Sequence, residues 1–181
     1  NQVEALVTSA AMGLPARWLG ALPRLRVVSS FGVGTDKLPL DACRERGIAV
    51  GYTPDVLNDC VADTAMAGLL AAARQVCAAD RFVRDGRWPQ GPFALTTQVS
   101  GKRLGILGLG RIGQTIARRA GGFDMDIAYH GRKPVQGVSW RYEPSLTELA
   151  RWADFLVLAV SGGAPTRHMV NEAVLQALGP K

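Results

Sequence analysis

The sequence has little cysteine and histidine, and this scarcity narrows the classes of protein to which it can belong. Its 181 residues include three cysteines and two histidines. Cys43, Cys60 and Cys77 are widely spaced, form no C-x-x-C pair and are odd in number, which argues against a disulfide framework. We therefore expect a reducing, cytoplasmic setting, no metal site, and cysteines that serve as small core residues rather than nucleophiles.

Long apolar runs and long basic runs are also missing. No stretch approaches the roughly 20 apolar residues that a membrane helix needs, and no basic segment followed by an apolar one opens the chain. The chain carries 21 Lys and Arg against 15 Asp and Glu, a net charge of +6, but it has no polybasic run. We therefore expect neither a membrane segment nor a nucleic-acid partner, and we assign much of the excess charge to a polyanionic small molecule.

Apolar segments of strand length alternate with segments of helical pattern. The expected strands are 3–8, 25–29, 48–52, 103–107, 126–130, 140–142 and 155–159, and the expected helices are 41–46, 56–84, 114–120, 146–153 and 172–178. Ser145, with Glu148 as its capping-box partner, and Asn171 are expected to cap the last two helices. The last strand is continuously apolar, as in a parallel strand covered on both faces. The alternation predicts an α/β protein with a doubly wound parallel sheet.

The segment 56–84 predicts one long, alanine-rich helix. Val61, Ala65, Leu69 and Ala72 recur near the helical period and form one apolar stripe. Few charges flank this stripe, so the helix suits a domain connection or a subunit interface. An ordinary core helix fits the same pattern.

A G-x-G-x-x-G motif stands between the apolar strand 103–107 and the helix that follows it. In this context Gly108 allows a tight turn, Gly110 lets a pyrophosphate approach the backbone, and Gly113 lets helix and strand pack closely. The helix N-terminus offers unpaired N–H groups and a partial positive charge to the phosphates. The sequence therefore predicts a dinucleotide site.

The segment after the next strand indicates which dinucleotide binds. NAD sites place Asp or Glu at the end of this strand to hold the ribose 2′-hydroxyl. Here His130 is followed by Gly131, Arg132, Lys133 and Pro134, so two cations stand where a carboxylate is usual. A guanidinium can grip a 2′-phosphate with two hydrogen bonds, which predicts NADPH in preference to NADH. The alternative is a solvated basic turn.

Three strings together resemble a known family. Ser29 to Asp36, Gly51 to Asp59, and Ser100 to Gly113 occur in this order and spacing in D-isomer-specific 2-hydroxyacid dehydrogenases. The likeness is greatest to the NADPH-preferring glyoxylate/hydroxypyruvate reductase branch, which includes hydroxyphenylpyruvate reductases. The resemblance implies reduction of a 2-keto acid to a D-2-hydroxy acid by hydride transfer from NADPH.

The resemblance also implies an architecture of two Rossmann-like domains, with the cofactor domain inserted into the substrate domain. Residues 1–56 would be part of a flavodoxin-like substrate domain. Residues 57–181 would be part of the NAD(P)-binding domain and include the long helix. The family is mostly dimeric through this helix region, so a homodimer is expected.

The matching positions imply the following site. The backbone N–H groups of Val33 and Gly34 would bind the substrate carboxylate, in a turn that could form an anion nest or be a plain βα turn. The residues that would contact the dinucleotide are Gly108, Gly110, Arg111, Ile112, Gly113, Gly131, Arg132, Lys133, Pro134, Ser161 and Val61.

The sequence departs from the family in its catalytic residues. The family's Arg, acidic residue and His have no match here and are expected beyond Lys181. The chain begins at Asn1 rather than Met and ends just after a helical pattern, so both ends look cut. His130 and His168 do not match the catalytic position and are expected to be structural or cofactor-side. We expect no turnover by these 181 residues alone. Residues 162–165, Gly-Gly-Ala-Pro, replace a Leu-Thr-Pro-type turn.

Two other functions remain open at this point. A non-catalytic, dinucleotide-sensing corepressor uses the same fold, but Arg132 and Lys133 argue against a sensor of NADH. Phosphoglycerate dehydrogenase also uses it, but that enzyme normally carries an acidic residue where this strand ends. Rates with NADPH and NADH on small and larger keto acids would separate the three.

Overall fold

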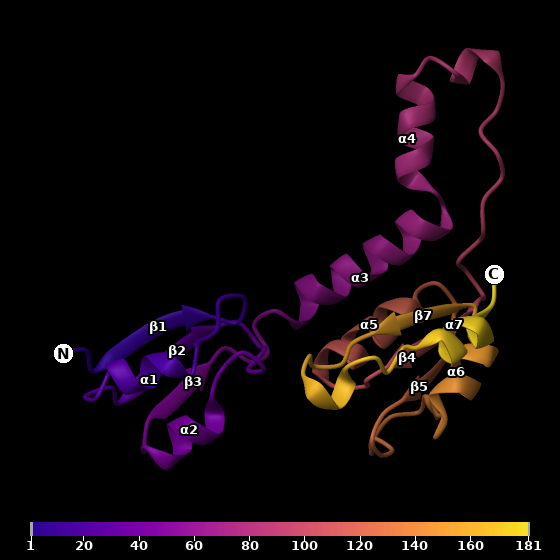
Figure 1. The fold of residues 1–181 in the computed structure, drawn as a ribbon. Helices are drawn as coiled ribbons and strands as arrows, with labels where there is room; N and C mark the ends of the chain where they lie inside the picture. The colour runs from indigo at the N-terminus through magenta and orange to yellow at the C-terminus, as the bar shows by residue number, and fades with distance from the viewer. Residues whose placement is uncertain (1, 181) are drawn as a thin grey trace. The chain divides into compact units, whose positions relative to one another are not determined.

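The computed structural model describes residues 2–180, and the chain separates into two compact units (Figure 1). One unit comprises residues 1–57 and 161–167, and the other comprises 58–160 and 168–181. Asn1 and Lys181, the outermost residues of the two predicted domains, lie outside the described residues. The domain limits of 1–56 and 57–181 stay predictions.

The first unit is built on a three-stranded parallel sheet in the order β1-β2-β3. Its elements are β1 (Ala5–Ser9), α1 (Arg17–Ala21), β2 (Val27–Phe31), α2 (Leu40–Glu45), β3 (Ala49–Tyr52) and the 3₁₀ turn η2 (Ala164–Thr166). Strands β1 and β2 begin two residues later than predicted. Leu25 explains the error at β2, because it is buried in the core without belonging to the ladder.

The second unit contains a four-stranded parallel sheet in the order β6-β5-β4-β7. Its elements are α3 (Asn58–Ala73), α4 (Val76–Arg84), the 3₁₀ turn η1 (Trp88–Gln90), β4 (Arg103–Leu107), α5 (Arg111–Gly121), β5 (Asp126–His130), β6 (Arg141–Tyr142), α6 (Leu146–Trp152), β7 (Phe155–Leu158) and α7 (Glu172–Leu178). The chain runs from β4 outward to β5 and β6 and then returns to the other side of β4. This reversal is the topological switch point beside which α/β proteins bind ligands. The predicted parallel α/β fold is confirmed.

The core of the second unit lies between the sheet and helices α3 and α5. The buried face of α3 carries Ala62, Met66, Leu69 and Ala73. Arg119 of α5 also joins the two helices by ion pairs with two carboxylates of α3. Three of the four predicted stripe residues are therefore wrong by one position, and only Leu69 is correct. The alanines on every side of the helix leave its buried face poorly defined in the sequence.

The predicted long helix is wrong, because the chain breaks between α3 and α4. Gln75 adopts a left-handed conformation with φ of 52°. The carbonyl of Ala73 accepts a hydrogen bond from the backbone N–H of Thr97 at 3.2 Å, where a continuous helix would have used the N–H of residue 77. A contact from 24 residues downstream thus takes the place of a glycine or proline as the helix breaker.

Two local predictions need correction at helix α6 and strand β7. Ser145 does accept the N–H of Glu148 at 3.3 Å, but the Glu148 carboxylate pairs with Arg151 and does not complete a capping box. Leu158 of β7 is 55% exposed, so this strand is not covered along both faces. The Asn171 cap is confirmed by its bond from the N–H of Val174 at 3.1 Å.

The cysteine prediction is correct at one position and wrong at two. Cys43 is buried in the core of the first unit, where burial raises the pKa of its thiol. Cys60 and Cys77 are exposed on α3 and α4. Among the described residues, no helix is long and apolar enough to cross a bilayer.

An ion pair fastens the beginning of β7 to the beginning of β4. The Asp154 carboxylate accepts the Nη2 and Nε of Arg103 at 2.8 and 3.1 Å, and also its backbone N–H at 2.9 Å. The side chain of Asp154 is 20% exposed. Chiefly through the hydrogen bonds from Arg103, the pKa of Asp154 falls to about 2.

We expect Asp154→Asn to lower the free energy of unfolding by about 1–2 kcal/mol at pH 7, a range reduced for the partial exposure of both side chains. Because the folded-state pKa lies below the unfolded value, the stabilisation is complete above that value. It disappears as the pH falls from about 4 to about 2. Urea unfolding at pH 7 and pH 3 measures this. Asp80→Asn, which removes an exposed pair on α4, is the control and should change little.

Candidate functional site

Glycines shape the turn between β4 and α5. Gly108 has φ of 95°, and a Cβ there would stand 2.7 Å from Val160 Cγ1 and 2.8 Å from the carbonyl oxygen of Ala159. A Cβ on Gly113 would stand 2.1 Å from the carbonyl oxygen of Gly108. All three distances are shorter than a real Cβ contact, so only glycine at these two positions lets the turn pass beside β7 and lets α5 start against it.

Gly110 differs from these two glycines, because no atom lies within 4 Å of the position of its Cβ. Its backbone is extended, and it is the N-cap of α5. The packing of the turn therefore does not require glycine here, and the absence of a side chain leaves the N-terminus of α5 open to approach. Arg111 is exposed and Ile112 half-buried in the first turn of α5. This combination of a tight turn, an open approach and a helix N-terminus fits the pyrophosphate of a dinucleotide.

The basic loop begins directly beside the glycine turn. Leu107 pairs with His130 in the parallel ladder, and the N–H of Gly108 donates to the carbonyl of His130 at 2.8 Å. Arg132, Lys133 and Pro134 follow and are exposed. Within residues 2–180, neither cation forms an ion pair or hydrogen bond. The side-chain N–H groups of Arg132 and Lys133 are thus available to a ligand beside the glycine turn.

Two tyrosines that the sequence analysis missed hold this loop at both ends. Tyr142 donates its hydroxyl to the carbonyl of Gly131 at 3.2 Å, and the N–H of Val135 donates to the hydroxyl of Tyr129 at 2.8 Å. A signal was present in the sequence. Two of its three tyrosines stand on the expected strands that flank the basic segment.

The two histidines have different surroundings. Nδ1 of His130 lies 2.9 Å from the carbonyl oxygen of Glu143, which ties the end of β5 to the end of β6. His168 adopts a left-handed conformation with φ of 57° in the turn that precedes α7. Among the described residues, no group of three His, Cys, Asp or Glu side chains could hold a metal ion.

Val33 and Gly34 lie in the loop after β2, in the first unit. Gly32, which precedes them, has φ of 119° and is held by Thr53, whose hydroxyl accepts its N–H at 2.8 Å. The backbone N–H groups of Val33 and Gly34 donate to no other group between residues 2 and 180. Two adjacent unpaired donors after a glycine turn are what an anion nest requires. Sequence reasoning missed the part played by Thr53.

The other predicted contacts lie apart from the glycine turn in the sequence. Val61 is 39% exposed on α3 and is not a member of the core. Ser161 is exposed, and its carbonyl accepts the Thr166 hydroxyl at 2.8 Å in the segment that groups with the first unit. The unusual sequence at 162–165 leads into the short turn η2. Their roles stay predictions.

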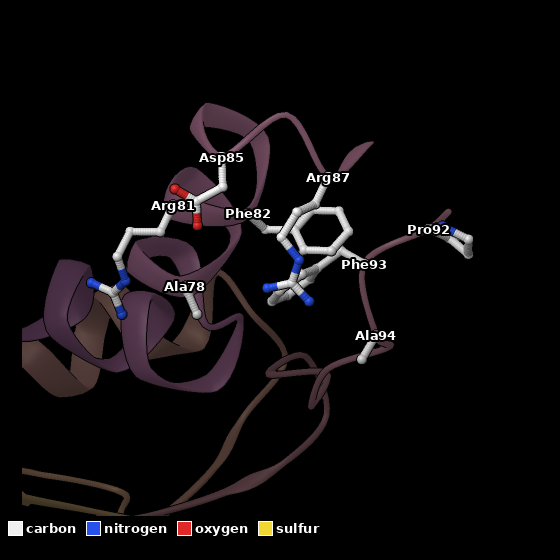
Figure 2. A pocket seen from close by; sticks show the side chains of 8 residues that line it. All are labelled: Ala78, Arg81, Phe82, Asp85, Arg87, Pro92, Phe93 and Ala94. Atoms are coloured by element: carbon white, nitrogen blue, oxygen red, sulfur yellow. The ribbon is translucent and has the colours of Figure 1, made fainter. Parts of the chain in front are cut away.

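A separate pocket of about 430 Å³ lies between α4 and the loop that follows it (Figure 2). The Arg87 guanidinium lies over the ring of Phe82 at 4.6 Å, and that ring meets Phe93 edge-on with centroids 5.3 Å apart. The lining residues are Ala78, Arg81, Phe82, Asp85, Arg87, Pro92, Phe93 and Ala94. None of them is a predicted site residue.

The sequence and the fold are both similar to known proteins. Residues 66–181 match the family described as D-isomer specific 2-hydroxyacid dehydrogenase, NAD binding domain. The chain is 47% identical over its whole length to glyoxylate/hydroxypyruvate reductase A of Arabidopsis thaliana and 46% identical to hydroxyphenylpyruvate reductase of Plectranthus scutellarioides. In both comparisons it spans 58% of the relative's length.

A solved structure agrees with these relatives. It is an NADPH-dependent glyoxylate/hydroxypyruvate reductase from Sinorhizobium meliloti, in complex with NADP and malonate. The TM-score is 0.93 with 42% identity, over 99% of this chain and 56% of that one.

Proposed function

We propose that this chain, which belongs to the D-isomer specific 2-hydroxyacid dehydrogenase family, is part of an NADPH-dependent reductase of small 2-keto acids. The substrate would be of the glyoxylate or hydroxypyruvate type, and the product a D-2-hydroxy acid. The relatives named above support this substrate class, because two of them are named for glyoxylate and hydroxypyruvate.

One observation carries the proposed cofactor preference. The hydrogen bond from Gly108 to His130 sets the loop with Arg132 and Lys133 beside the glycine turn, and no carboxylate ends β5. An acidic residue at this position would repel a 2′-phosphate, whereas a guanidinium and an ammonium attract it. The adenosine end of NADPH therefore meets charges of opposite sign.

The chain's own residues would bind and orient the reactants. The N-terminus of α5 and the open approach at Gly110 would hold the pyrophosphate, and Arg132 and Lys133 would hold the 2′-phosphate. The unpaired N–H groups of Val33 and Gly34 would bind the carboxylate of the keto acid. When bound, NADPH supplies the hydride that reduces C2 of the substrate. Such positioning lowers the entropic part of the barrier.

Steady-state kinetics on the full-length protein test this function. Glyoxylate, hydroxypyruvate and a larger 2-keto acid would each be reduced with NADPH and with NADH, and kcat/KM compared. We expect the highest kcat/KM with NADPH and a small keto acid. Absence of keto acid reduction would refute the reductase, and equal use of both cofactors would refute the proposed preference.

We also propose a homodimer in which the region of α3 and α4 forms the interface. Helix α4 has no buried residue, and its neighbourhood exposes Val76, Val83 and Trp88 by 51%, 54% and 60%. Apolar side chains in such number on one helix and its following turn are typical of an interface. Sedimentation of the full-length protein measures its mass.

Few and scattered cysteines support the cytoplasm as its compartment.

A further inference from the structure

The loop 131–135 is held by groups that lie outside it. Its first carbonyl, on Gly131, accepts the hydroxyl of Tyr142, and its last N–H, on Val135, donates to the hydroxyl of Tyr129. Between these two hydrogen bonds stand Arg132, Lys133 and Pro134, and all three are exposed. The two ends are therefore fixed, while the charged side chains between them reach solvent.

The two tyrosines form one rigid support. Tyr129 and Tyr142 pair directly across β5 and β6, with ring centroids 5.5 Å apart and planes inclined by 56°. Tyr129 is 2% exposed, so its ring is fixed by the core. Aromatic pairs at this separation attract one another beyond the burial of their area. The hydroxyls therefore present a donor and an acceptor at fixed positions above the end of β5.

The strand end before the loop is fixed as well. The carbonyl of His130 accepts the N–H of Gly108, and its Nδ1 lies 2.9 Å from the carbonyl oxygen of Glu143. The first residue of the loop is therefore held next to the glycine turn. The His130 contacts do not fix the conformation of the loop beyond its first residue. The two tyrosine hydroxyls and the ring of Pro134 restrict that conformation.

We propose that Tyr129 and Tyr142 are positioning residues that hold the loop in the conformation that presents Arg132 and Lys133 to the cofactor's 2′-phosphate. They would thereby set how strongly NADPH is preferred over NADH. This inference rests on the proposed function, because it assumes that the loop binds the 2′-phosphate. Neither hydroxyl need touch the cofactor, since each acts through its hydrogen bond to the loop backbone.

The physical basis is preorganisation. A five-residue loop that is ordered before binding loses less conformational entropy when NADPH arrives than a mobile one does. NADH lacks the 2′-phosphate and gains little from an ordered loop. Removing one hydroxyl should therefore weaken NADPH and leave NADH almost unchanged, whereas general damage to the fold would weaken both.

The test uses Tyr142→Phe and Tyr129→Phe in the full-length protein. Direct titration gives the Kd of NADPH and NADH, and of the fragments 2′,5′-ADP and 5′-AMP, which report the 2′-phosphate alone. Since one hydrogen bond is removed, we expect Tyr142→Phe to weaken NADPH and 2′,5′-ADP by about 3- to 10-fold. NADH and 5′-AMP should change less than about 2-fold. Tyr52→Phe removes an exposed hydroxyl of β3 and is the matched control.

Tyr129→Phe leaves the N–H of Val135 without its partner and could lower stability, so its melting temperature is measured alongside. Amide hydrogen exchange provides a second readout, because Val135 should lose protection in this variant even without cofactor. In an Arg132→Ala, Lys133→Ala background, Tyr142→Phe should have no further effect on the ratio of the two Kd values.

The outcomes separate this inference from the proposed function. If the parent protein binds NADPH and NADH equally, the proposed preference fails and this inference fails with it. If the parent prefers NADPH and Arg132→Ala reduces that preference, but Tyr142→Phe changes neither Kd or weakens both equally, the inference alone is overturned. A Tyr142→Phe effect that persists without Arg132 and Lys133 would overturn it as well.

Discussion

Gly113→Ala should weaken the binding of NADPH and NADH alike, by about 100-fold, and should destabilise the second unit by about 1–3 kcal/mol. The added Cβ would stand 2.1 Å from the carbonyl oxygen of Gly108, so either α5 or the glycine turn must shift. Such a shift would misplace the N–H groups that we assign to the pyrophosphate, which both cofactors share. Titration with each cofactor and urea unfolding measure the two effects.

Two other glycines, one at the N-cap of α5 and one at its end, separate the effect on binding from the effect on folding. Gly110→Ala meets no atom within 4 Å, so it should fold normally and still lose cofactor affinity, because the new methyl group occupies the approach to the helix. Gly121→Ala also meets no atom, at the far end of α5, and should keep both stability and affinity. Normal binding by Gly110→Ala would contradict the approach that we assign to the pyrophosphate.

Arg132→Ala should weaken NADPH by about 10- to 100-fold and leave NADH within about 2-fold of the parent protein. The range follows from the roughly 1.5–3 kcal/mol typical of a hydrogen bond to a charged group. Lys133→Ala should have a smaller effect, since an ammonium cannot form two parallel bonds to a phosphate. Added salt should reduce the preference for NADPH, because Arg132 and Lys133 are exposed to solvent and are screened.

The control for charge alone is Arg26→Ala, which removes an exposed cation from the first unit. It should change neither Kd. Arg132→Asp gives the opposite test, since a carboxylate at this place should repel the 2′-phosphate and turn the preference towards NADH. Equal weakening of both cofactors by Arg132→Ala would show that this side chain does not recognise the 2′-phosphate.

Where local signals agreed, the sequence predicted elements to the residue. The limits of β4, β5 and α7 matched the structure, and α5 began a few residues before its predicted start. Each of these segments is bounded by a glycine, a charged end or an asparagine cap, and such signals depend on neighbouring residues only. The glycine turn belongs to the same class, because its sterics involve β4, α5 and the end of β7 alone.

Features that depend on distant contacts could not be predicted. The break at Gln75 depends on Thr97, which caps the carbonyl of Ala73 from another part of the chain. The phase of the α3 stripe depends on α5, because alanines on every side give no preferred face until a partner helix is present. The support of the basic loop depends on the pairing of β5 with β6, which sets Tyr142 opposite Tyr129.

The anchoring of loop 131–135 from outside has a practical consequence for enzyme engineering. Because Tyr129, Tyr142 and the Gly108–His130 bond fix both ends and Pro134 stiffens the loop, the two exposed cations between them can be exchanged independently. A library confined to positions 132 and 133 can therefore search for altered coenzyme use without changing the groups that order the loop. A library that also varied the two tyrosines would mix recognition with loop order, and its variants would be harder to interpret.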